Sequence, residues 1–322
     1  MMLFRRVLAL VLSSIALAAA AQAFPSKPIR WIVPYTPGGI TDSVTRLITA
    51  KLQDSLGQPV VVENKPGANS IVGADLVAKS PADGYTFLTV IAAHAANATL
   101  YAGKLPFDPV KDFAPVSLAA IAPLILTVNN DFPVRDMKGL IDYARANPGK
   151  ISFGSSGIGA AAHLTTELLK QTTGVNMVHV PYKGTAPALA ALLAGDIQVL
   201  VDVPSSMMQH VRASKVRALG MFSAKRVAGA PEVPTVAEAG GPALESSTWV
   251  LILAPAGTPR EIVNRVSAEL GKILAAPEMR ERLDKLGIDA VGSTPAEAGR
   301  FLDGEIVKWA KVINTAGIKA EQ

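Results

Sequence analysis

Cysteine is absent from this chain of 322 residues. Without thiols the chain forms no disulfide, offers no cysteine nucleophile and has no cysteine to which a lipid could be attached. A fold of this size must therefore be stabilised by its hydrophobic core. Because a large exported protein without cysteine needs no oxidative folding, the absence fits the bacterial periplasm.

Strong charge of either sign is also lacking. Charged residues make up 18% of the sequence and aromatic residues 5%, and no run of lysine and arginine is interleaved with aromatic side chains. Two of the positive charges behind the formal net charge of +5, Arg5 and Arg6, lie in a segment typical of a removable leader. This composition excludes a nucleic-acid partner, because binding to phosphates requires a basic patch.

The chain contains one long apolar run, Val7–Ala20, whose length of about fourteen residues falls short of the roughly 20 needed to span a membrane. It follows the basic segment Met1–Arg6 and precedes Ala21-Gln22-Ala23, a small-x-small pattern typical of signal-peptidase cleavage. We expect residues 1–23 to be a signal peptide cleaved after Ala23, and the mature protein to be exported to the periplasm. The alternative for this segment is a membrane anchor.

What the sequence does contain is enough apolar material for a substantial core. Hydrophobic residues make up 49% of the chain and the mean hydropathy is +0.31, which excludes a disordered chain. A length of 322 residues favours two domains. Short apolar segments, glycine-containing loops and segments with helical spacing alternate along the chain, which is typical of an α/β fold with parallel sheets.

This alternation occurs twice. Strands are expected over Ile29–Pro34, Val60–Glu63, Tyr85–Val90, Lys150–Phe153, Val175–Val180, Ile197–Val201, Val216–Phe222 and Trp249–Leu253. Helices are expected around Val44–Leu52, before Lys79, over Ala160–Gln171 and Pro187–Ala194, and around Ile262–Leu274 and Leu302–Ile313.

The two series are separated by Phe113–Val128, an apolar stretch that Pro115 and Pro123 make too broken for one helix. It is long enough to run between two lobes, and the strand Trp249–Leu253 then carries the chain back. The expected lobes are a discontinuous first lobe, residues 24–124 and 249–322, and a second lobe, residues 125–248.

Two junctions between a strand and a helix are suited to hold an anion. Pro34–Asp42 and Gly154–His163 each join a strand to a helix through a glycine-containing loop. Glycine lets a ligand approach the backbone, and the first amides of a helix lack partners and carry the positive end of its dipole. Ligands of open α/β sheets gather beyond the carboxyl ends of strands, so both loops can face one crevice. For Gly38-Gly39 the alternative is a tight turn without a ligand.

The donors in these loops are amides and hydroxyls. Polar side chains come from Thr36, Thr41 and Asp42 in the first loop, with a possible N-cap among them, and from Ser155 and Ser156 in the second. Neither loop contains lysine or arginine. A carboxylate would therefore be held by amides, hydroxyls, helix dipoles and water.

For two further residues, His163 and Asp202, the sequence allows both a role in ligand binding and a purely structural role. His163, in the first turn of its helix, would donate to a ligand or complete the loop. Asp202, at the end of a strand, would bind a polar ligand tail or orient the partner lobe, or it would cap the next helix beside Ser205 and Ser206.

Enzyme and cofactor motifs are weak. The segment from Gly157 to Ala162 formally matches the dinucleotide fingerprint G-x-G-x-x-A, but the next strand, Val175–Val180, ends without the acidic residue that would bind a ribose. Ser155 and Ser156 form no G-x-S-x-G elbow, and no base is marked beside either serine. The four histidines show no i,i+4 pairing and no adjacent carboxylate at ligand spacing. We expect no catalytic residue, no metal and no cofactor.

Several motifs, in order, carry a resemblance to a known family. They are Ile29-Arg30-x-Ile32-Val33-Pro34-Tyr35-x-Pro37-Gly38-Gly39 with Asp42, Val61–Ala68, Ser80-Pro81-x-Asp83-Gly84-Tyr85-Thr86, Gly154-Ser155-Ser156-Gly157-x-Gly159 with His163, His179-Val180-Pro181-Tyr182-Lys183-Gly184, Pro234-Thr235-x-x-Glu238 and Leu253-Ala254-Pro255-x-Gly257-Thr258-Pro259. With the leader, they resemble the Bug/TctC family, periplasmic substrate-binding proteins of the tripartite tricarboxylate transporter class.

The resemblance implies a type II periplasmic-binding-protein fold, in which two α/β lobes joined by crossover strands close on a small carboxylate like a Venus flytrap. It implies that the first loop of lobe 1 and the Gly/Ser loop of lobe 2 hold the ligand, partly through ordered water. The ligand-binding residues so predicted are Tyr35, Thr36, Pro37, Gly38, Gly39, Asp42, Ser155, Ser156, Gly157, Gly159 and Asp202, to which we add His163. Ala160 departs from the family pattern, which commonly has a serine there.

The sequence thus predicts a non-enzymatic, exported receptor that captures a small carboxylate and delivers it to the membrane subunits of a tripartite tricarboxylate-type transporter. We expect a monomer. The alternatives are a sensor that presents its closed form to a membrane signalling partner, and an exported hydrolase, which would need a base near Ser155 or Ser156. Ligand specificity is expected from residues beyond the carboxylate, around His94, Asn97, Asp202 and Trp249.

Overall fold

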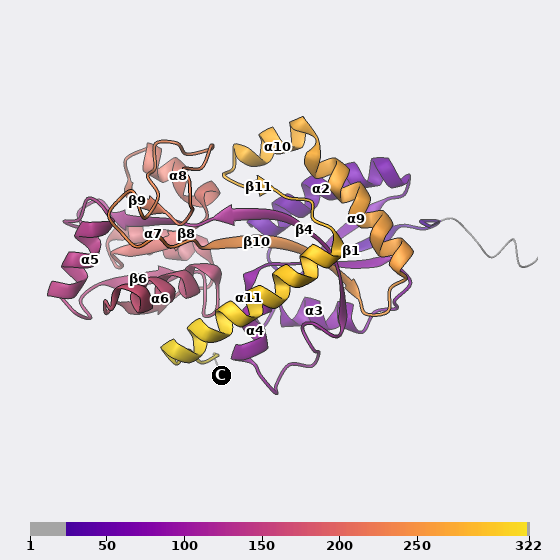
Figure 1. Ribbon diagram of the computed structural model, residues 1–322, viewed down its shortest axis with the longest axis horizontal. Coiled ribbons are helices and arrows are strands. Elements are labelled where there is room, and N and C mark those ends of the chain that lie inside the picture. Colours follow the sequence, from indigo (N-terminus) through magenta and orange to yellow (C-terminus); the bar gives the residue numbers. More distant parts are fainter. Residues whose placement is uncertain (1–23, 321–322) are drawn as a thin grey trace, which may run out of the picture.

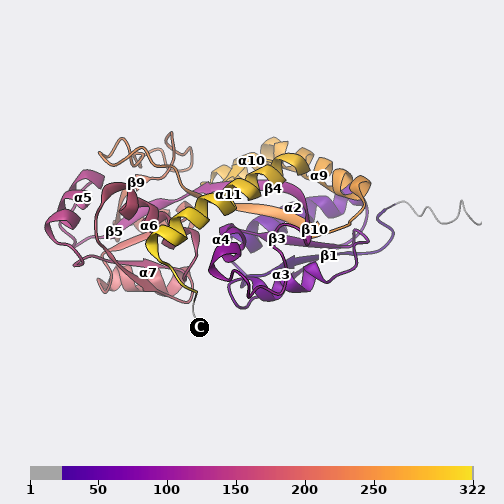
Figure 2. The same ribbon diagram turned by 60° about the horizontal axis from the view of Figure 1, so that its bottom comes forward.

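Residues 24–320 are described by a computed structural model, and the predicted signal peptide, residues 1–23, lies outside them. Figure 1 shows two halves, each built on a β-sheet with helices on its faces, and Figure 2 shows the same halves from a second direction. The predicted α/β fold with two lobes joined by crossover strands is confirmed.

The first half is built on a six-stranded sheet in the order β11-β4-β10-β3-β1-β2. Its strands are β1 (Ile29–Val33), β2 (Val60–Asn64), β3 (Thr86–Val90), β4 (Phe113–Pro123), β10 (Ser247–Pro255) and β11 (Asp289–Ala290). Its helices are α2 (Ile40–Leu56), α3 (Ile71–Ala78), α4 (Ala92–Leu100), α9 (Arg260–Ala275), α10 (Pro277–Asp284) and α11 (Pro295–Ala316). Because side chains alternate along a strand, Trp31 belongs to a buried cluster that includes residues of α2 and α9, and Ile32 to a second cluster that includes residues of α3 and α11.

The second half is built on a five-stranded sheet in the order β7-β6-β8-β5-β9. Its strands are β5 (Ile125–Asn129), β6 (Ser152–Ser155), β7 (Val178–Pro181), β8 (Val199–Asp202) and β9 (Val216–Met221). Its helices are α5 (Met137–Ala146), α6 (Ala161–Thr173), α7 (Thr185–Ala194) and α8 (Pro204–Arg212).

The prediction of parallel sheets is only partly confirmed. β1 pairs in parallel with β2 and β3, and β6 with β7 and β8, where helices connect the strands. In contrast, β10 runs antiparallel to β3 and β4, and β5 runs antiparallel to β8 and β9. The reason is that β4, β5 and β10 lie where the chain crosses between the halves, so no helical crossover within one sheet dictates their direction.

The two chain segments that cross between the halves are joined by backbone hydrogen bonds next to Leu124. Its amide donates to the carbonyl of Ser246 at 3.1 Å, Ser246 donates to Phe222 at 3.0 Å, and Phe222 donates back to Leu124 at 2.8 Å. Leu124 lies between β4 and β5, and Ser246 lies directly before β10. The predicted lobe boundaries at residues 124 and 249 stay a prediction, which the change of sheet at this point supports.

The predicted helices are found as α2, α3, α6, α7, α9 and α11. The sequence interpretation does not include α4, α5 or α10, and it mentions the helix after Asp202, which is α8, without bounds. Six of the nine residues of α4 are buried, so no polar face marks it as a helix. The buried residues Met137, Leu140, Ile141 and Ala144 of α5 do have helical spacing, a signal sufficient to find it. Within residues 24–320, no helix combines the length and the apolar character needed to cross a membrane.

Helix α11 lies across both halves, as Figures 1 and 2 agree in showing. It packs on β4 and α4 of the first half and on α6 of the second. Gln171 on α6 donates its side-chain amide to the carbonyl of Val312 at 3.0 Å, and Leu164 of α6 joins a buried cluster of the first half. The halves are therefore in contact through side chains as well as through the crossing strands.

Two tryptophans of this cluster share one carboxylate. The indole N–H groups of Trp249 and Trp309 both donate to Oε2 of Glu305, each at 2.8 Å, and Lys308 donates to Oε1 at 3.2 Å. The buried side chain of Glu305 on α11 thus accepts all three hydrogen bonds. This bond places Trp249 in the core, so the expectation that Trp249 contributes to ligand specificity is wrong.

We expect Glu305→Ala to lower the free energy of unfolding by about 2–4 kcal/mol, because two buried indole N–H groups lose their acceptor. Glu305→Gln retains a carbonyl oxygen and should lose less. Urea denaturation measures both, with Asp303→Ala, an exposed change on the same helix, as the control. Equal effects of Glu305→Ala and Asp303→Ala would contradict the assignment.

Candidate functional site

The first candidate loop joins β1 to α2 and is exposed from Thr36 to Gly39. Gly38 has a φ of +88°, a left-handed conformation that favours glycine. Gly39 is the N-cap of α2, and no side chain caps the helix there. The predicted N-cap among Thr36, Thr41 and Asp42 is therefore wrong, and the first amides of α2 are left without a side-chain acceptor.

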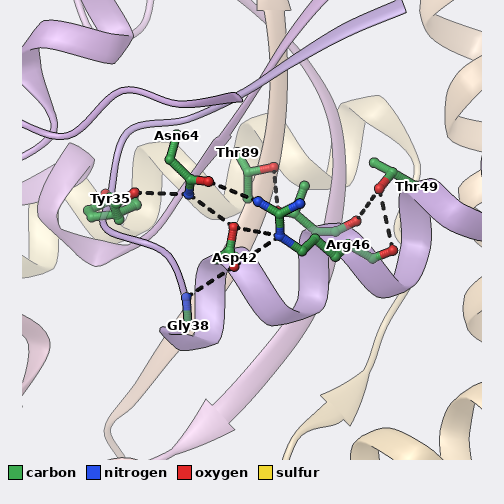
Figure 3. Close-up of polar contacts among 8 residues, drawn as sticks. Tyr35, Gly38, Asp42, Arg46, Thr49, Asn64 and Thr89 are labelled. Carbon is green, nitrogen blue, oxygen red and sulfur yellow. Dashed lines mark hydrogen bonds and ion pairs between the residues drawn. The ribbon is translucent and has the colours of Figure 1, made fainter. Parts of the chain in front are cut away.

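Asp42 lies in the first turn of α2, where its carboxylate is fully engaged (Figure 3). One oxygen accepts the amide of Gly38 at 3.0 Å, and the other accepts the side-chain amide of Asn64 at 2.9 Å. Arg46 donates to both oxygens, at 3.0 and 3.1 Å. Burial raises the pKa of Asp42, but the hydrogen bonds from these partners outweigh it and hold that pKa below its usual value. Because Arg46 compensates its charge, Asp42 shapes the loop without making the helix start repel an anion.

Tyr35 ties the same loop to two further elements. Its carbonyl accepts the side-chain amide of Asn64 at the end of β2, at 3.1 Å. Its hydroxyl accepts the amide of Ile91, directly before α4, at 3.4 Å. Burial raises the pKa of Tyr35 to about 12, so the hydroxyl stays protonated and can donate as well as accept.

The second candidate loop joins β6 to α6 and turns at Gly157 and Gly159, whose φ angles are +141° and +78°. Ala160 is the N-cap of α6 and makes no side-chain hydrogen bond to the helix. The hydroxyl that a serine would supply at this position is missing, so the first amides of α6 also lack a side-chain acceptor. The two candidate loops thus share an uncapped helix start.

Ser155 is completely buried at the end of β6. The inference that no base lies beside it is wrong, because Nε2 of His179 lies 2.7 Å from its Oγ. The same Oγ donates to the carbonyl of Gly157 at 3.0 Å and accepts the amide of Gly157 at 3.2 Å. The Ser155 hydroxyl is therefore occupied by partners within the second half.

A second histidine joins this group. The ring of His163 stacks on the ring of His179, with centroids 3.7 Å apart, and its Nδ1 accepts the amide of Gly159 at 3.2 Å. Burial, with smaller contributions from His179 and Lys170, lowers the pKa of His163 to about 3. Burial and Lys170 lower the pKa of His179 to about 4. Both rings are neutral near pH 7. The bond to Gly159 supports the interpretation that His163 completes the loop, and a contact of His163 with a ligand stays a prediction.

The second loop touches the first half at Gly159. A Cβ atom at this position would lie 2.4 Å from the tip of the Leu100 side chain of α4 and 3.5 Å from the side-chain amide of Asn69. This distance and the left-handed φ of +78° both favour glycine here. Because Tyr35 of the first loop contacts the amide directly before α4, both candidate loops border the same helix.

Asp202 bridges the starts of two helices in the second half. One oxygen accepts the hydroxyl of Thr185, the first residue of α7, at 2.8 Å, and the other accepts the amide of Val203, the N-cap of α8, at 2.7 Å. Burial raises the pKa of Asp202. A contact of Asp202 with a ligand stays a prediction.

Of the residues expected to set ligand specificity, His94 lies in the core and Asn97 lies near the contact between the halves. His94 is buried and bonds through Nε2 to the carbonyl of Pro109 at 2.9 Å, so it belongs to the core. Asn97 accepts the side-chain amide of Asn69 at 2.7 Å, and Asn69 is a neighbour of Gly159. Asn97 is therefore close to the contact between the halves.

Four residues of these networks are absent from the predicted site residues: Arg46, Asn64, Asn69 and His179. Arg46 follows Asp42 by four residues on α2, a spacing that predicts an ion pair. Asn64 lies at the end of β2, opposite Val33, and His179 lies opposite Phe153. These two pairings depend on the register between strands, which no local pattern specifies.

Within the described part of the chain, no group of three or more potential ligands is arranged to hold a metal ion. Glu167 does lie one turn after His163, a pairing missing from the sequence interpretation. Its Oε1 is 4.0 Å from Nε2 of His163 and 2.7 Å from Nζ of Lys170. Glu167 is therefore the partner of a lysine.

Comparisons with known proteins find relatives over nearly the whole chain. The model of a family described as "Tripartite tricarboxylate transporter family receptor" matches residues 44–318. BugT of Bordetella pertussis is 36% identical over 312 residues, which are 95% of this chain and 94% of BugT.

Two similar solved structures are described with a ligand. Rpa4515 of Rhodopseudomonas palustris with adipate is 37% identical, has a TM-score of 0.85 and covers 92% of this chain and 99% of its own. MatC from the same organism with bound malate is 32% identical, has a TM-score of 0.80 and covers 90% of this chain and 100% of its own.

We expect the protein to lose stability as the pH falls from about 6.5 toward about 4. Burial lowers the pKa of folded His94 to about 4 from its ordinary 6.5, so the unfolded state binds more protons in this window. Stability is then fully present above the unfolded pKa and is lost as the pH falls. For His94 alone, the free energy of unfolding should drop by about 2 kcal/mol between about pH 7 and about pH 5.

His94→Gln is the matched variant for this measurement, because it retains a donor for the carbonyl of Pro109 but does not titrate. Urea denaturation at both pH values should show a weaker pH dependence for His94→Gln than for the wild type. The same pH dependence in both chains would contradict the assignment.

Proposed function

Because this chain belongs to the tripartite tricarboxylate transporter receptor family, we propose that it captures a small carboxylate between the two candidate loops. It then delivers this ligand to the membrane subunits of a tripartite tricarboxylate-type transporter. The resemblance to the Bug/TctC family is confirmed, and these proteins are substrate-binding proteins and not enzymes. The observation that carries the proposal is that two glycine-containing loops, one from each half, border α4, the first at its start beside Ile91 and the second at its end beside Leu100. Each of these loops leads into a helix without a side-chain cap, a property that α2 and α6 share with most described helices.

The chemistry of the loops favours a carboxylate. Helix starts without a side-chain acceptor attract anions, and neither loop contributes a lysine or arginine. Asp42 would repel an anion, but Arg46 compensates its charge. Two relatives are described with adipate and malate, which are both small dicarboxylates.

Closure of the two halves is the expected signal of occupancy. A ligand that touches both loops binds the closed arrangement more tightly than an open one and stabilises it by that difference. The close approach of Gly159 to Leu100 and Asn69 supports such an arrangement, because the second loop then lies against the first half.

The pair of Ser155 and His179 does not favour the alternative of a hydrolase. A nucleophilic serine has to be presented to its substrate, and Ser155 is completely buried. Its hydroxyl also bonds to the backbone of its own loop. We assign this pair a role in shaping the loop.

The proposed location of the mature receptor is the periplasm, after cleavage of residues 1–23. N-terminal sequencing of the protein recovered from a periplasmic fraction tests this, and we expect the first residue to be Phe24. A mature chain that retains the apolar run Val7–Ala20 would contradict export by cleavage.

Delivery to a transporter is tested in cells. Native mass spectrometry of freshly purified protein identifies a retained ligand, and uptake of that ligand is then compared between wild-type cells and cells that lack the gene. Loss of uptake supports delivery. Normal uptake combined with a lost transcriptional response would contradict delivery and support a sensor.

We expect Gly39→Val to raise the Kd for adipate or malate about tenfold or more while the melting temperature stays nearly unchanged. Gly39 has a φ of −74°, and nothing lies within 4 Å of a Cβ atom built there. Valine therefore fits the fold but fills the space in front of the first amides of α2.

Gly304→Val is the matched control, because Gly304 is exposed on α11 and also has nothing within 4 Å of its Cβ position. Its Kd should equal that of the wild type in the same calorimetric titration. An unchanged Kd for Gly39→Val would refute the placement of the ligand at the first loop.

A further inference from the structure

His163 on α6 and His179 on β7 form a stacked pair next to the second candidate loop. Their ring planes are 10° apart, and Phe153 of β6 stacks on His179 at 4.9 Å. Each ring bonds to one group of the loop region: His179 to the hydroxyl of Ser155, and His163 to the amide of Gly159. No other side chain bonds to either group in the part of the chain that the structure describes.

The bond to Gly159 determines where His163 carries its proton. A backbone amide can only donate, so Nδ1 of His163 has to be unprotonated, and the proton of the neutral ring lies on Nε2. The nearest carboxylate oxygen, of Glu167, is 4.0 Å from Nε2 and is bonded to Lys170. His163 therefore acts on the loop through one nitrogen, as an acceptor.

The bonds of Ser155 determine which ring nitrogen of His179 acts on the loop. Oγ lies within hydrogen-bonding distance of the carbonyl of Gly157, and the amide of Gly157 donates to Oγ. The remaining short contact joins Oγ to Nε2 of His179 at 2.7 Å. Nε2 donates in this bond when the hydroxyl proton goes to Gly157, and it accepts when the hydroxyl donates to His179. In both cases His179 acts on the loop through Nε2, the ring nitrogen opposite to the one that His163 uses.

We propose that His163 and His179 are positioning residues of the carboxylate site, which hold the second loop in the shape that packs Gly159 against α4. Given the proposed function, neither ring touches the ligand. Each fixes one end of the loop, and the stacking of the rings joins the two ends into one unit. The first amides of α6 then face the ligand only while both bonds are made.

The two opposite ring nitrogens allow a crossed test. The side-chain amide of asparagine lies near the Nδ1 position of histidine, and that of glutamine near the Nε2 position. At residue 163 the matched variant is His163→Asn, and the mismatched one is His163→Gln. At residue 179 the order reverses, so His179→Gln is matched and His179→Asn is mismatched. His163→Phe and His179→Phe keep a stacked ring but make neither bond.

Two measurements are made on the full chain. Calorimetry with adipate and with malate gives the Kd, and NMR gives the hydrogen-exchange rate of the Gly159 amide without any ligand. We expect the mismatched and phenylalanine variants to bind about tenfold more weakly and the matched variants to stay within about threefold of the wild type. The Gly159 amide should exchange faster in His163→Gln and His163→Phe than in His163→Asn.

Packing alone predicts a different pattern, in which phenylalanine is the best replacement and asparagine and glutamine do not differ. That pattern, or wild-type Kd and exchange in the phenylalanine variants, would overturn the positioning role. If the phenylalanine variants fold poorly, the comparison of asparagine with glutamine at each site decides. If the wild type binds neither adipate nor malate, the carboxylate proposal fails for these ligands, while exchange at Gly159 still tests the positioning of the loop.

Discussion

The proposed binding of a carboxylate depends on the unpaired amides at the starts of α2 and α6. A polar N-cap stabilises a helix, and the structure shows one on α5, from Asp136, and on α11, from Thr294. The other described helices begin without a side-chain cap, and at the two candidate loops the N-cap residues are Gly39 and Ala160. These two helices give up a cap, and their amides stay available to a ligand.

The groups around these amides keep the site close to neutral. Arg46 compensates Asp42, and burial leaves Tyr35 protonated and the histidine pair uncharged near pH 7. A carboxylate in such a site is held by bonds from neutral donors, which are weak in water and stronger where water is excluded. Affinity therefore depends on how closely the halves approach each other. The backbone hydrogen bonds that join Leu124, Ser246 and Phe222, together with the packing of α11 on α6, limit the movements that can bring the two halves together.

The strand–loop–helix units could be predicted from the sequence because their signals are local. The apolar run before Pro34, the glycines after it and the helical spacing from Val44 all lie within one short segment, and β1 and α2 follow them. The N-cap could not be placed, because the start of a helix is uncertain by one or two residues in any pattern. The bond between Ser155 and His179 joins residues 24 positions apart. It depends on the register of β6 and β7, which is a property of the folded sheet.

The close approach at Gly159 also restricts how this chain can change over generations. Every other amino acid brings a Cβ atom, which at this position would meet Leu100 at 2.4 Å and require an L-residue at a φ of +78°. A mutation here would strain the left-handed backbone and would require the tip of the Leu100 side chain, or the loop itself, to move. Changes of ligand preference are therefore less costly at other positions, and the backbone at residue 159 favours the retention of glycine.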